Sequence, residues 1–323
     1  MIDKKMMVTL GGLPQKIHIK GNNEKNPILL FLHGGPGVCN RHTVMTTHAD
    51  LCRYFTLVAW DQRGSGGSYR GAAVETLTVD RLVEDAHELV LWLCREFGRD
   101  KLFIIGGSWG SELGTLLAYR YPEHLAAYVG FGQVVNGAKN EELSYRFALE
   151  AARKAGDAKS IAILEKVGPP VQGVYKGGFD GMMAQRRVMM KYGGYSQSRR
   201  KRSYFRSTVL PMVFSGEYSL SDLIGVAKGY KYVLTAMWPQ VGATDLQRDC
   251  PRFEIPYFIF DGRLDQNTPA ALVQDYFDGL TAPVKELIWF EHSGHNPMTD
   301  EPERFKALLV DRLTAIAQKE KNV

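Results

Sequence analysis

The sequence predicts an α/β fold in which a mostly parallel β-sheet is covered by helices. Apolar runs typical of buried strands alternate with helical patterns in the first third of the chain. A long middle segment without convincing buried strands follows, and the alternation resumes near the C-terminus. Alternating strands and helices favour a parallel sheet, because the crossover between two parallel strands is usually a helix.

The first third supplies the first strands and helices. An opening hairpin is expected at residues 7–10 and 16–20. Continuous apolar runs predict buried strands at residues 28–32, 56–60, 102–105 and 128–131. Apolar positions at helical spacing predict helices at residues 79–97 and 112–120.

The middle of the chain reads as an insertion. Helices are expected there at residues 141–155, 158–166 and 220–234. The alternation then resumes with strands at residues 257–260 and 286–290 and helices at residues 269–280 and 302–317. We therefore expect an α/β core formed by residues 1–132 and 252–323, with residues 133–251 inserted as a helical cap.

Composition indicates a globular protein with a large core, since 45% of the 323 residues are hydrophobic and 23% are charged. The first residues carry charge without a sustained apolar stretch, and no window approaches the length of a membrane span. We expect a soluble, cytoplasmic protein without a membrane partner. The cysteines, Cys39, Cys52, Cys94 and Cys250, are scattered without zinc-type spacing, which predicts reduced thiols and no metal site.

The net charge of +5 is unevenly distributed. A basic run without acidic residues comprises Arg186, Arg187, Lys191, Arg199, Arg200, Lys201, Arg202 and Arg206. A solvated basic face is the simplest interpretation, and an anionic substrate or partner is the alternative. Because no recognised nucleic-acid-binding module accompanies the run, we expect no nucleic-acid partner.

A G-x-S-x-G pattern around Ser108 lies between a predicted strand and a predicted helix. In a sharp strand-to-helix turn flanking side chains clash, so glycines are needed at Gly106 and Gly110. Such a turn exposes the serine and points the backbone N–H of Trp109 toward a developing negative charge. The pattern predicts that Ser108 is a nucleophile, and a glycine-rich loop that merely turns is the alternative.

A nucleophilic serine needs a base, and the base needs an orienting carboxylate. With this turn the expected chain order is serine, acid, histidine, each after the carboxyl end of a strand. Asp265 and His295 follow predicted strands in this order. Asp261 and His292 are rival candidates for the same roles. In the structural alternative, Asp265 only caps a helix and His295 is a loop residue.

The loop after residues 28–32 is a candidate for the other half of an oxyanion hole. It begins with His33 and contains Gly34, Gly35 and Gly37, which allow the backbone to approach a ligand closely. We favour the N–H of Gly35 over that of Gly34 as the second donor. His33 is expected to anchor the loop by hydrogen bonds rather than to act as a second base.

These motifs together resemble those of the proline iminopeptidase branch of the α/β-hydrolase superfamily. The resemblance rests on residues 33–37, 60–66, 106–110 and 293–295. It implies an eight-stranded α/β-hydrolase core with a helical cap and no metal or organic cofactor. It also implies a catalytic triad and an oxyanion hole, formed by Ser108, Asp265, His295, Gly35 and Trp109, and it makes residues 61–63 a structural loop.

The cap departs from the family pattern. Aminopeptidases that this chain resembles hold the free amino group of the substrate with cap glutamates, often in a Trp-Glu pair, and this chain contains no Trp-Glu dipeptide. Glu217, Asp222 and Asp245 are possible substitutes, and the basic run disfavours a cationic substrate. The candidate substrate contacts are Gly34, Glu217 and Trp238.

We therefore expect a serine hydrolase that cleaves an ester or amide bond of a small molecule or short peptide through an acyl-enzyme. One alternative is a carboxylesterase or lactonase whose cap is lined by apolar residues, with candidates Tyr175, Phe179, Met182, Met183, Met189, Met190 and Trp238. Another is a non-catalytic ligand-binding protein on a hydrolase scaffold. No pattern in the sequence indicates an oligomeric state.

Overall fold

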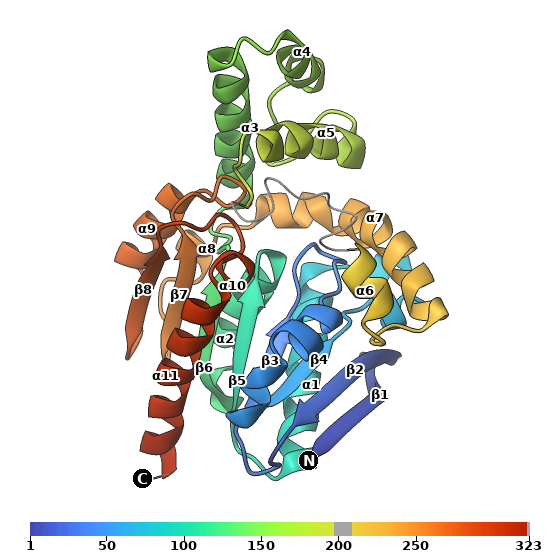
Figure 1. Cartoon of the computed structure of the whole chain (residues 1–323), viewed down its shortest axis with the longest axis vertical. Helices are drawn as coiled ribbons and strands as arrows, with labels where there is room; N and C mark the ends of the chain where they lie inside the picture. The colour runs from blue at the N-terminus through green and yellow to red at the C-terminus, as the bar shows by residue number, and fades with distance from the viewer. Residues whose placement is uncertain (197–208, 322–323) are drawn as a thin grey trace.

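The computed structural model describes residues 1–196 and 209–321, which form a single central sheet with helices on both faces (Figure 1). The strands are β1 (Ile2–Leu10), β2 (Leu13–Gly21), β3 (Ile28–Leu32), β4 (Thr56–Trp60), β5 (Leu102–Gly107), β6 (Leu125–Phe131), β7 (Tyr257–Gly262) and β8 (Lys285–Phe290). Their order in the sheet is β1-β2-β4-β3-β5-β6-β7-β8. β1 and β2 form an antiparallel hairpin, and β3 to β8 are parallel. The predicted eight-stranded, mostly parallel sheet is confirmed.

The α-helices also follow the predicted alternation. They are α1 (Val79–Phe97), α2 (Trp109–Arg120), α3 (Gly137–Lys154), α4 (Ala158–Val167), α5 (Gly178–Lys191), α6 (Leu210–Phe214), α7 (Leu220–Ala243), α8 (Leu246–Asp249), α9 (Ala270–Gly279), α10 (Pro297–Asp300) and α11 (Pro302–Lys321). The sequence did not predict α5, whose interior Gly181 lowers helix propensity. It also missed α6, α8 and α10, which are too short to show a helical period, and α7 continues beyond the prediction through Pro239.

The sheet buries both of its faces because successive side chains of each strand point in opposite directions. In β3, Leu30 and Leu32 pack in a cluster with α1, α2 and α9. Leu29 and Phe31 pack in a second cluster with α11 and with the helical turns before β4. This two-sided burial explains why the strands appear in the sequence as continuous apolar runs.

The described part of the segment between β6 and β7 lies at the edge of the sheet where the parallel strands end. Helices α3 to α5 stand above this edge, and α7 crosses beneath them (Figure 1). The described residues of this segment contain helices and no strand of the sheet, in line with the predicted insertion. The boundaries after residue 132 and before residue 252 stay a prediction.

Most of the apolar cap residues that the esterase alternative uses form the core of the cap itself. Tyr175, Met182 and Met189 belong to a buried cluster between α3, α4, α5 and α7. Phe179 and Met183 pack against this cluster, and Met190 is exposed.

The basic run is only partly described. Lys191 forms an ion pair with Asp157, while Arg187 is exposed. Arg199, Arg200, Lys201, Arg202 and Arg206 lie outside the described residues. All four cysteines are buried free thiols, and none of the described helices is long and apolar enough to cross a membrane.

One buried carboxyl group joins the core to the end of α7. Glu112, in the first turn of α2, accepts a hydrogen bond of 2.6 Å from the hydroxyl of Thr244, and its Oε2 has no partner within the described residues. Burial raises the pKa of Glu112 to about 8 from its ordinary value of 4.5. The folded protein therefore keeps a proton at neutral pH that the unfolded chain has released.

Replacing Glu112 with glutamine is expected to flatten the dependence of stability on pH. The wild-type free energy of unfolding should fall as pH rises between 4.5 and about 8, because this carboxyl group binds its proton more tightly in the folded state. Urea denaturation at several pH values measures the slope. The exposed Glu123→Gln variant serves as control and should keep the wild-type slope, whereas parallel curves for Glu112→Gln and wild type would contradict the assignment.

Candidate functional site

Ser108 sits in a strained turn between β5 and α2. Its backbone angles, φ 56° and ψ −127°, lie in a region that residues with a side chain rarely adopt. A Cβ on Gly106 would lie 2.0 Å from the carbonyl oxygen of Gly110, and a Cβ on Gly110 would lie 2.0 Å from that of Leu32. The glycines on either side of Ser108 are thus required by close backbone contacts, as the sequence predicts.

Two backbone N–H groups lie next to Ser108. Trp109 begins α2, and Gly35 lies in the loop after β3 with φ +115°. Both residues line the same cavity as Ser108, and neither N–H donates a hydrogen bond within the described residues. Gly34 packs against the turn, since a Cβ on it would lie 3.1 Å from the Cβ of Ser108. This arrangement can stabilise negative charge beside the serine.

His33 anchors the loop after β3, as expected from the sequence. Its Nε2 accepts a hydrogen bond of 3.1 Å from the backbone N–H of Gln62. The proton of the neutral ring is therefore on Nδ1, which donates a hydrogen bond of 2.9 Å to the carbonyl oxygen of Gly34. Burial lowers the pKa of His33 to about 4, so the ring is neutral at neutral pH. A neutral, fully hydrogen-bonded ring is suited to holding the loop.

Asp265 and His295 meet after β7 and β8. The Oδ2 atom of Asp265 lies 2.8 Å from Nδ1 of His295. The carboxylate also accepts hydrogen bonds from the backbone N–H groups of Asn267 and Thr268 and from the Thr268 hydroxyl, at 2.7, 3.1 and 2.6 Å. These bonds fix the orientation of the carboxylate, and the carboxylate in turn fixes the tautomer of His295.

The rival residues have other environments. Asp261 is buried, but its Oδ1 accepts hydrogen bonds from the N–H groups of Gly132 and Gly262, at 2.8 and 3.2 Å. Burial and the nearby charge of Asp265 raise the pKa of Asp261. His292 is exposed. The structure thus brings Asp265, and not Asp261, to the histidine.

The serine and the histidine are not joined in this conformation. The amide nitrogen of Asn267 donates a hydrogen bond of 3.2 Å to Nε2 of His295. Nε2 is the acceptor because Nδ1 of the same ring carries the proton and donates to Asp265. The hydroxyl of Ser108 has no hydrogen-bond partner within the described residues. Hydrogen bonds between a catalytic serine and its histidine are often long in the unbound enzyme and shorten when a substrate is bound.

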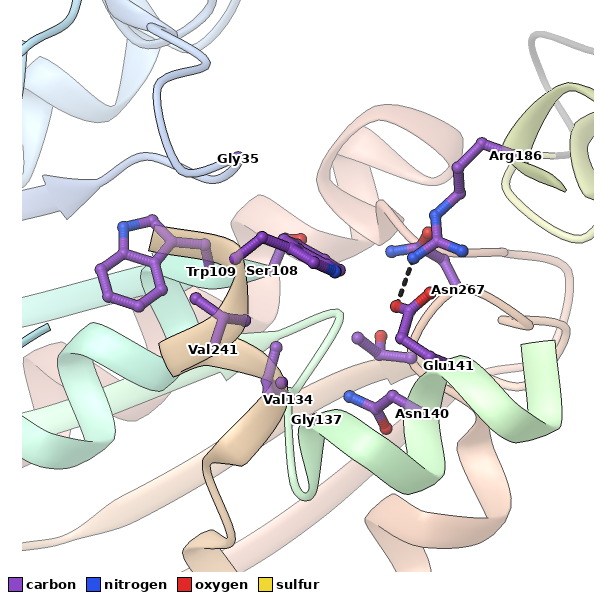
Figure 2. Close-up of a pocket in the computed structure, with 13 residues that line it drawn as sticks. Gly35, Ser108, Trp109, Val134, Gly137, Asn140, Glu141, Arg186, Val241 and Asn267 are labelled. Carbon is purple, nitrogen blue, oxygen red and sulfur yellow. Dashed lines mark hydrogen bonds and ion pairs between the residues drawn. The ribbon is translucent and has the colours of Figure 1, made fainter. Parts of the chain in front are cut away.

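A small cavity of about 30 Å³ opens beside Ser108 (Figure 2). Its lining residues are Gly35, Ser108, Trp109, Val134, Gly137, Asn140, Glu141, Arg186, Trp238, Val241, Gly242, Asn267 and Thr268. The sequence-predicted Trp238 is among them, and its indole N–H donates to the carbonyl oxygen of Gly173 at 3.0 Å. The predicted nucleophile and oxyanion donors thus share a cavity with residues of the inserted segment.

An ion pair closes the cavity across from Trp109 (Figure 2). Oε1 of Glu141, from α3, accepts a hydrogen bond from Arg186, from α5. Arg186 also donates to the side chain of Gln185 at 2.5 Å. This member of the basic run is therefore neutralised inside the cap and does not contribute to a solvated basic face.

Two residues that line the cavity each have an acceptor atom without a donor. Oε2 of Glu141 and Oδ1 of Asn140 are buried and have no hydrogen-bond partner within the described residues. Buried acceptors without donors cost free energy, so they mark a place where a ligand N–H group or an ordered water is stabilised. The sequence did not predict these residues because neither belongs to a Trp-Glu pair; their position in α3, the first helix after β6, was the available signal.

The predicted substrate contact of Glu217 is corrected by its position. Its carboxylate is held 2.6 Å from Nδ1 of His18 and 3.4 Å from Nζ of Lys5, and it does not line the cavity. Asp222 pairs with Arg41 at 2.9 Å. These acids join the insertion to the N-terminal part of the core, so their charge is already balanced.

Asp245, the third acid considered, has a local role. Its Oδ1 accepts a hydrogen bond of 3.3 Å from the backbone N–H of Arg248 and caps α8. It does not line the cavity beside Ser108.

Comparison with known proteins identifies similar folds and relatives. Residues 27–158 match the family model described as the alpha/beta hydrolase fold. The chain is 29% identical over 300 residues to a probable aminopeptidase of Bacillus subtilis, YbaC, with 92% of each chain covered. It is 30% identical over 160 residues to the proline iminopeptidase of Saccharolobus solfataricus, covering 46% of this chain and 49% of the relative.

Solved structures extend the similarity to the whole chain. The proline iminopeptidase of Mycobacterium smegmatis superposes with a TM-score of 0.69 at 19% identity, covering 98% of this chain and all of the other. VinJ superposes with a TM-score of 0.68 at 20% identity, covering 97% and 99%. At these identities the similarity concerns the fold alone.

Replacing Asp265 with asparagine is expected to slow fluorophosphonate labelling of Ser108 by roughly three to four orders of magnitude, because the amide favours the wrong tautomer of His295. The labelling rate of Asp261→Asn should stay within about tenfold of wild type, since its amide oxygen still accepts a hydrogen bond from the backbone N–H of Gly132. Labelling rates followed by intact-protein mass spectrometry distinguish the two variants. A larger loss in Asp261→Asn than in Asp265→Asn would reverse the assignment.

Proposed function

We propose that the chain, which is similar to α/β-hydrolases of the proline iminopeptidase-like branch, is a serine hydrolase that cleaves an ester or amide bond through an acyl-enzyme. One observation carries the proposal: the 2.8 Å contact between Asp265 and His295 lies directly behind Asn267 and Thr268, which line the cavity that Ser108 shares with two free N–H groups. A nucleophile, an oriented base and oxyanion donors are the parts that acyl transfer requires.

In the acylation step, Oγ of Ser108 attacks the substrate carbonyl carbon while Nε2 of His295 takes the hydroxyl proton. Asp265 stabilises the imidazolium that forms. The N–H groups of Gly35 and Trp109 bind the tetrahedral oxyanion. When the oxyanion collapses, His295 gives its proton to the leaving group and the acyl group remains on Ser108.

In the second step, water releases the acyl group. Nε2 of His295 takes a proton from a water molecule, whose oxygen attacks the acyl carbon and forms a second oxyanion at the same donors. Collapse expels Oγ of Ser108, which takes the proton back from His295. The acid is released and the enzyme returns to its starting state.

We infer that substrate binding enlarges this small cavity. A volume of about 30 Å³ holds a water molecule or two and no amino-acid residue. The amide of Asn267 also occupies Nε2 of His295, which must be free to accept the serine proton. We infer that the entering substrate displaces Asn267 and moves side chains of the cap away from Ser108.

Two acceptors favour the aminopeptidase form of this activity over a purely apolar esterase. Oε2 of Glu141 and Oδ1 of Asn140 lack donors at the cavity, and a protonated N-terminal amine supplies several N–H groups. We propose that they bind the free amino group of a short peptide or aminoacyl compound. The similarity to a probable aminopeptidase supports the same conclusion.

The second candidate is a carboxylesterase or lactonase without aminopeptidase activity. It is favoured by the ion pair that already neutralises Glu141 and by the apolar walls formed by Val134, Trp238 and Val241. A non-catalytic ligand-binding protein has the same fold but would not hydrolyse any substrate. Hydrolysis of matched amides and esters separates all three.

Glu141→Gln is the substitution that tests the proposed substrate class. Wild-type enzyme is expected to hydrolyse prolyl or alanyl p-nitroanilide as well as p-nitrophenyl acetate, and Ser108→Ala to abolish both activities. Because a charged hydrogen bond to the substrate amine is lost, Glu141→Gln should lower kcat/KM at least about tenfold more for the anilides than for the acetate ester.

Glu142→Gln is the matched control, because Glu142 neighbours Glu141 on α3 but is exposed and, among the described residues, pairs only with Arg146, at 3.5 Å. Its anilide and ester activities should match wild type. Equal losses of both activities in Glu141→Gln, or esters hydrolysed without anilides in wild type, would contradict the aminopeptidase assignment. Turnover that survives in Ser108→Ala would contradict the serine mechanism.

A further inference from the structure

Gln62 is hydrogen-bonded to the indole of Trp109 and to His33, at the start of the loop that carries Gly35, and we propose that it is a positioning residue that sets the spacing of the two N–H donors. This inference rests on the proposed serine hydrolase mechanism. Resemblance to a family assigns residues 61–63 to a structural loop, and the contacts of Gln62 go beyond that assignment.

The side chain of Gln62 spans the two elements that carry the donors. Its Oε1 accepts a hydrogen bond of 2.9 Å from the indole Nε1–H of Trp109. Its Nε2–H donates a hydrogen bond of 2.9 Å to the carbonyl oxygen of His33. The backbone N–H of Gln62 donates to Nε2 of the same histidine at 3.1 Å. One buried residue is thereby bonded to the residue that supplies one donor and to the first residue of the loop that supplies the other.

The two donors otherwise belong to separate parts of the chain. The N–H of Trp109 belongs to the turn between β5 and α2, whereas the N–H of Gly35 belongs to the loop after β3. That loop contains Gly34, Gly35 and Gly37, so it has few side chains with which to hold itself in place. An amide is planar and offers one acceptor and donors at fixed separation, which makes it suited to bracing the loop against the turn.

The neighbours of Gln62 point to other partners. Asp61 accepts from the guanidinium of Arg41 at 2.9 Å, and Arg63 donates to Asp85 at 2.7 Å. Neither ion pair contacts Trp109 or His33. Gln62 is also 1% exposed and does not line the cavity, so it acts on the reaction through the donors and does not touch the substrate.

Gln15 offers a matched control elsewhere in the protein. It is fully buried, and its Oε1 accepts a hydrogen bond of 3.0 Å from the indole Nε1–H of Trp60. Its Nε2 donates to the carbonyl oxygen of Leu10 at 3.3 Å and to Asp85 at 2.7 Å. Gln15 therefore also accepts from a tryptophan indole and donates to a carbonyl oxygen, but it lies in β2 and away from the cavity. Replacing Gln15 measures the effect on stability and activity of removing a buried amide that is not near the donors.

The experiment compares Gln62→Met with Gln15→Met, since methionine keeps the approximate volume and removes the hydrogen bonds. With p-nitrophenyl acetate, Gln62→Met is expected to lower kcat about 10- to 100-fold while KM changes less than about threefold, because displaced donors weaken only the transition state. Affinity for a boronic acid that forms a tetrahedral adduct should fall by a similar factor. Gln15→Met should keep kcat within about twofold even if both variants melt at lower temperature.

Gln62→Glu is the second variant and keeps an acceptor for the Trp109 indole while removing the donor to His33. The kcat of Gln62→Glu should lie between those of wild type and Gln62→Met. If Gln62→Met does not fold, Gln62→Glu is compared with wild type and Gln15→Met in its place. Unchanged kcat and boronic-acid affinity in the folded Gln62 variants, or equal losses in Gln15→Met, would overturn the inference. The Ser108→Ala variant distinguishes failure of the Gln62 inference from failure of the proposed mechanism. If Ser108→Ala is inactive while the Gln62 variants keep wild-type kcat, the inference fails and the serine hydrolase proposal stands.

Discussion

The strained backbone of Ser108 is the constraint on which the rest of the site depends. Its conformation exists only where β3, β5 and α2 approach so closely that no side chain fits at Gly106 or Gly110. That approach sets the serine at the start of α2, places Trp109 among the residues that line the cavity and presses Gly34 against the turn. The packing of the sheet stabilises the strained backbone of Ser108. The serine and the neighbouring N–H groups are therefore arranged before a substrate binds.

The core of the site was predictable because backbone geometry dictates its residues. Only glycine fits the positions flanking Ser108, and the parallel sheet delivers Asp265 and His295 to the same edge. Strand β3 and helix α1 also match their predicted bounds, since one is a continuous buried run and the other is capped by Thr78 and Gly98. The sequence also favours Asp265 over Asp261 as the acid, and in the structure Asp265 contacts His295 whereas Asp261 lies within β7.

The cap contacts were not predictable, because they depend on side chains far apart in the sequence. Glu141 meets Arg186 across 45 positions, and neither residue lies in a motif. Glu217 was assigned to the substrate from its charge alone, whereas its partner His18 lies 199 positions away. A carboxylate in a sequence does not reveal its partner, so the cap chemistry had to come from the tertiary structure. In that structure, the ion pair and the acceptors without donors belong to residues that line the cavity beside Ser108.

Direct detection of the acyl-enzyme tests the central claim most simply. Enzyme quenched with acid during turnover of p-nitrophenyl acetate, digested and examined by mass spectrometry, is predicted to carry one acetyl group on the peptide that contains Ser108. The same peptide should stay unmodified in Ser108→Ala, which should not turn over. Rapid turnover with the acetyl group on another residue, or persisting in Ser108→Ala, would contradict the account.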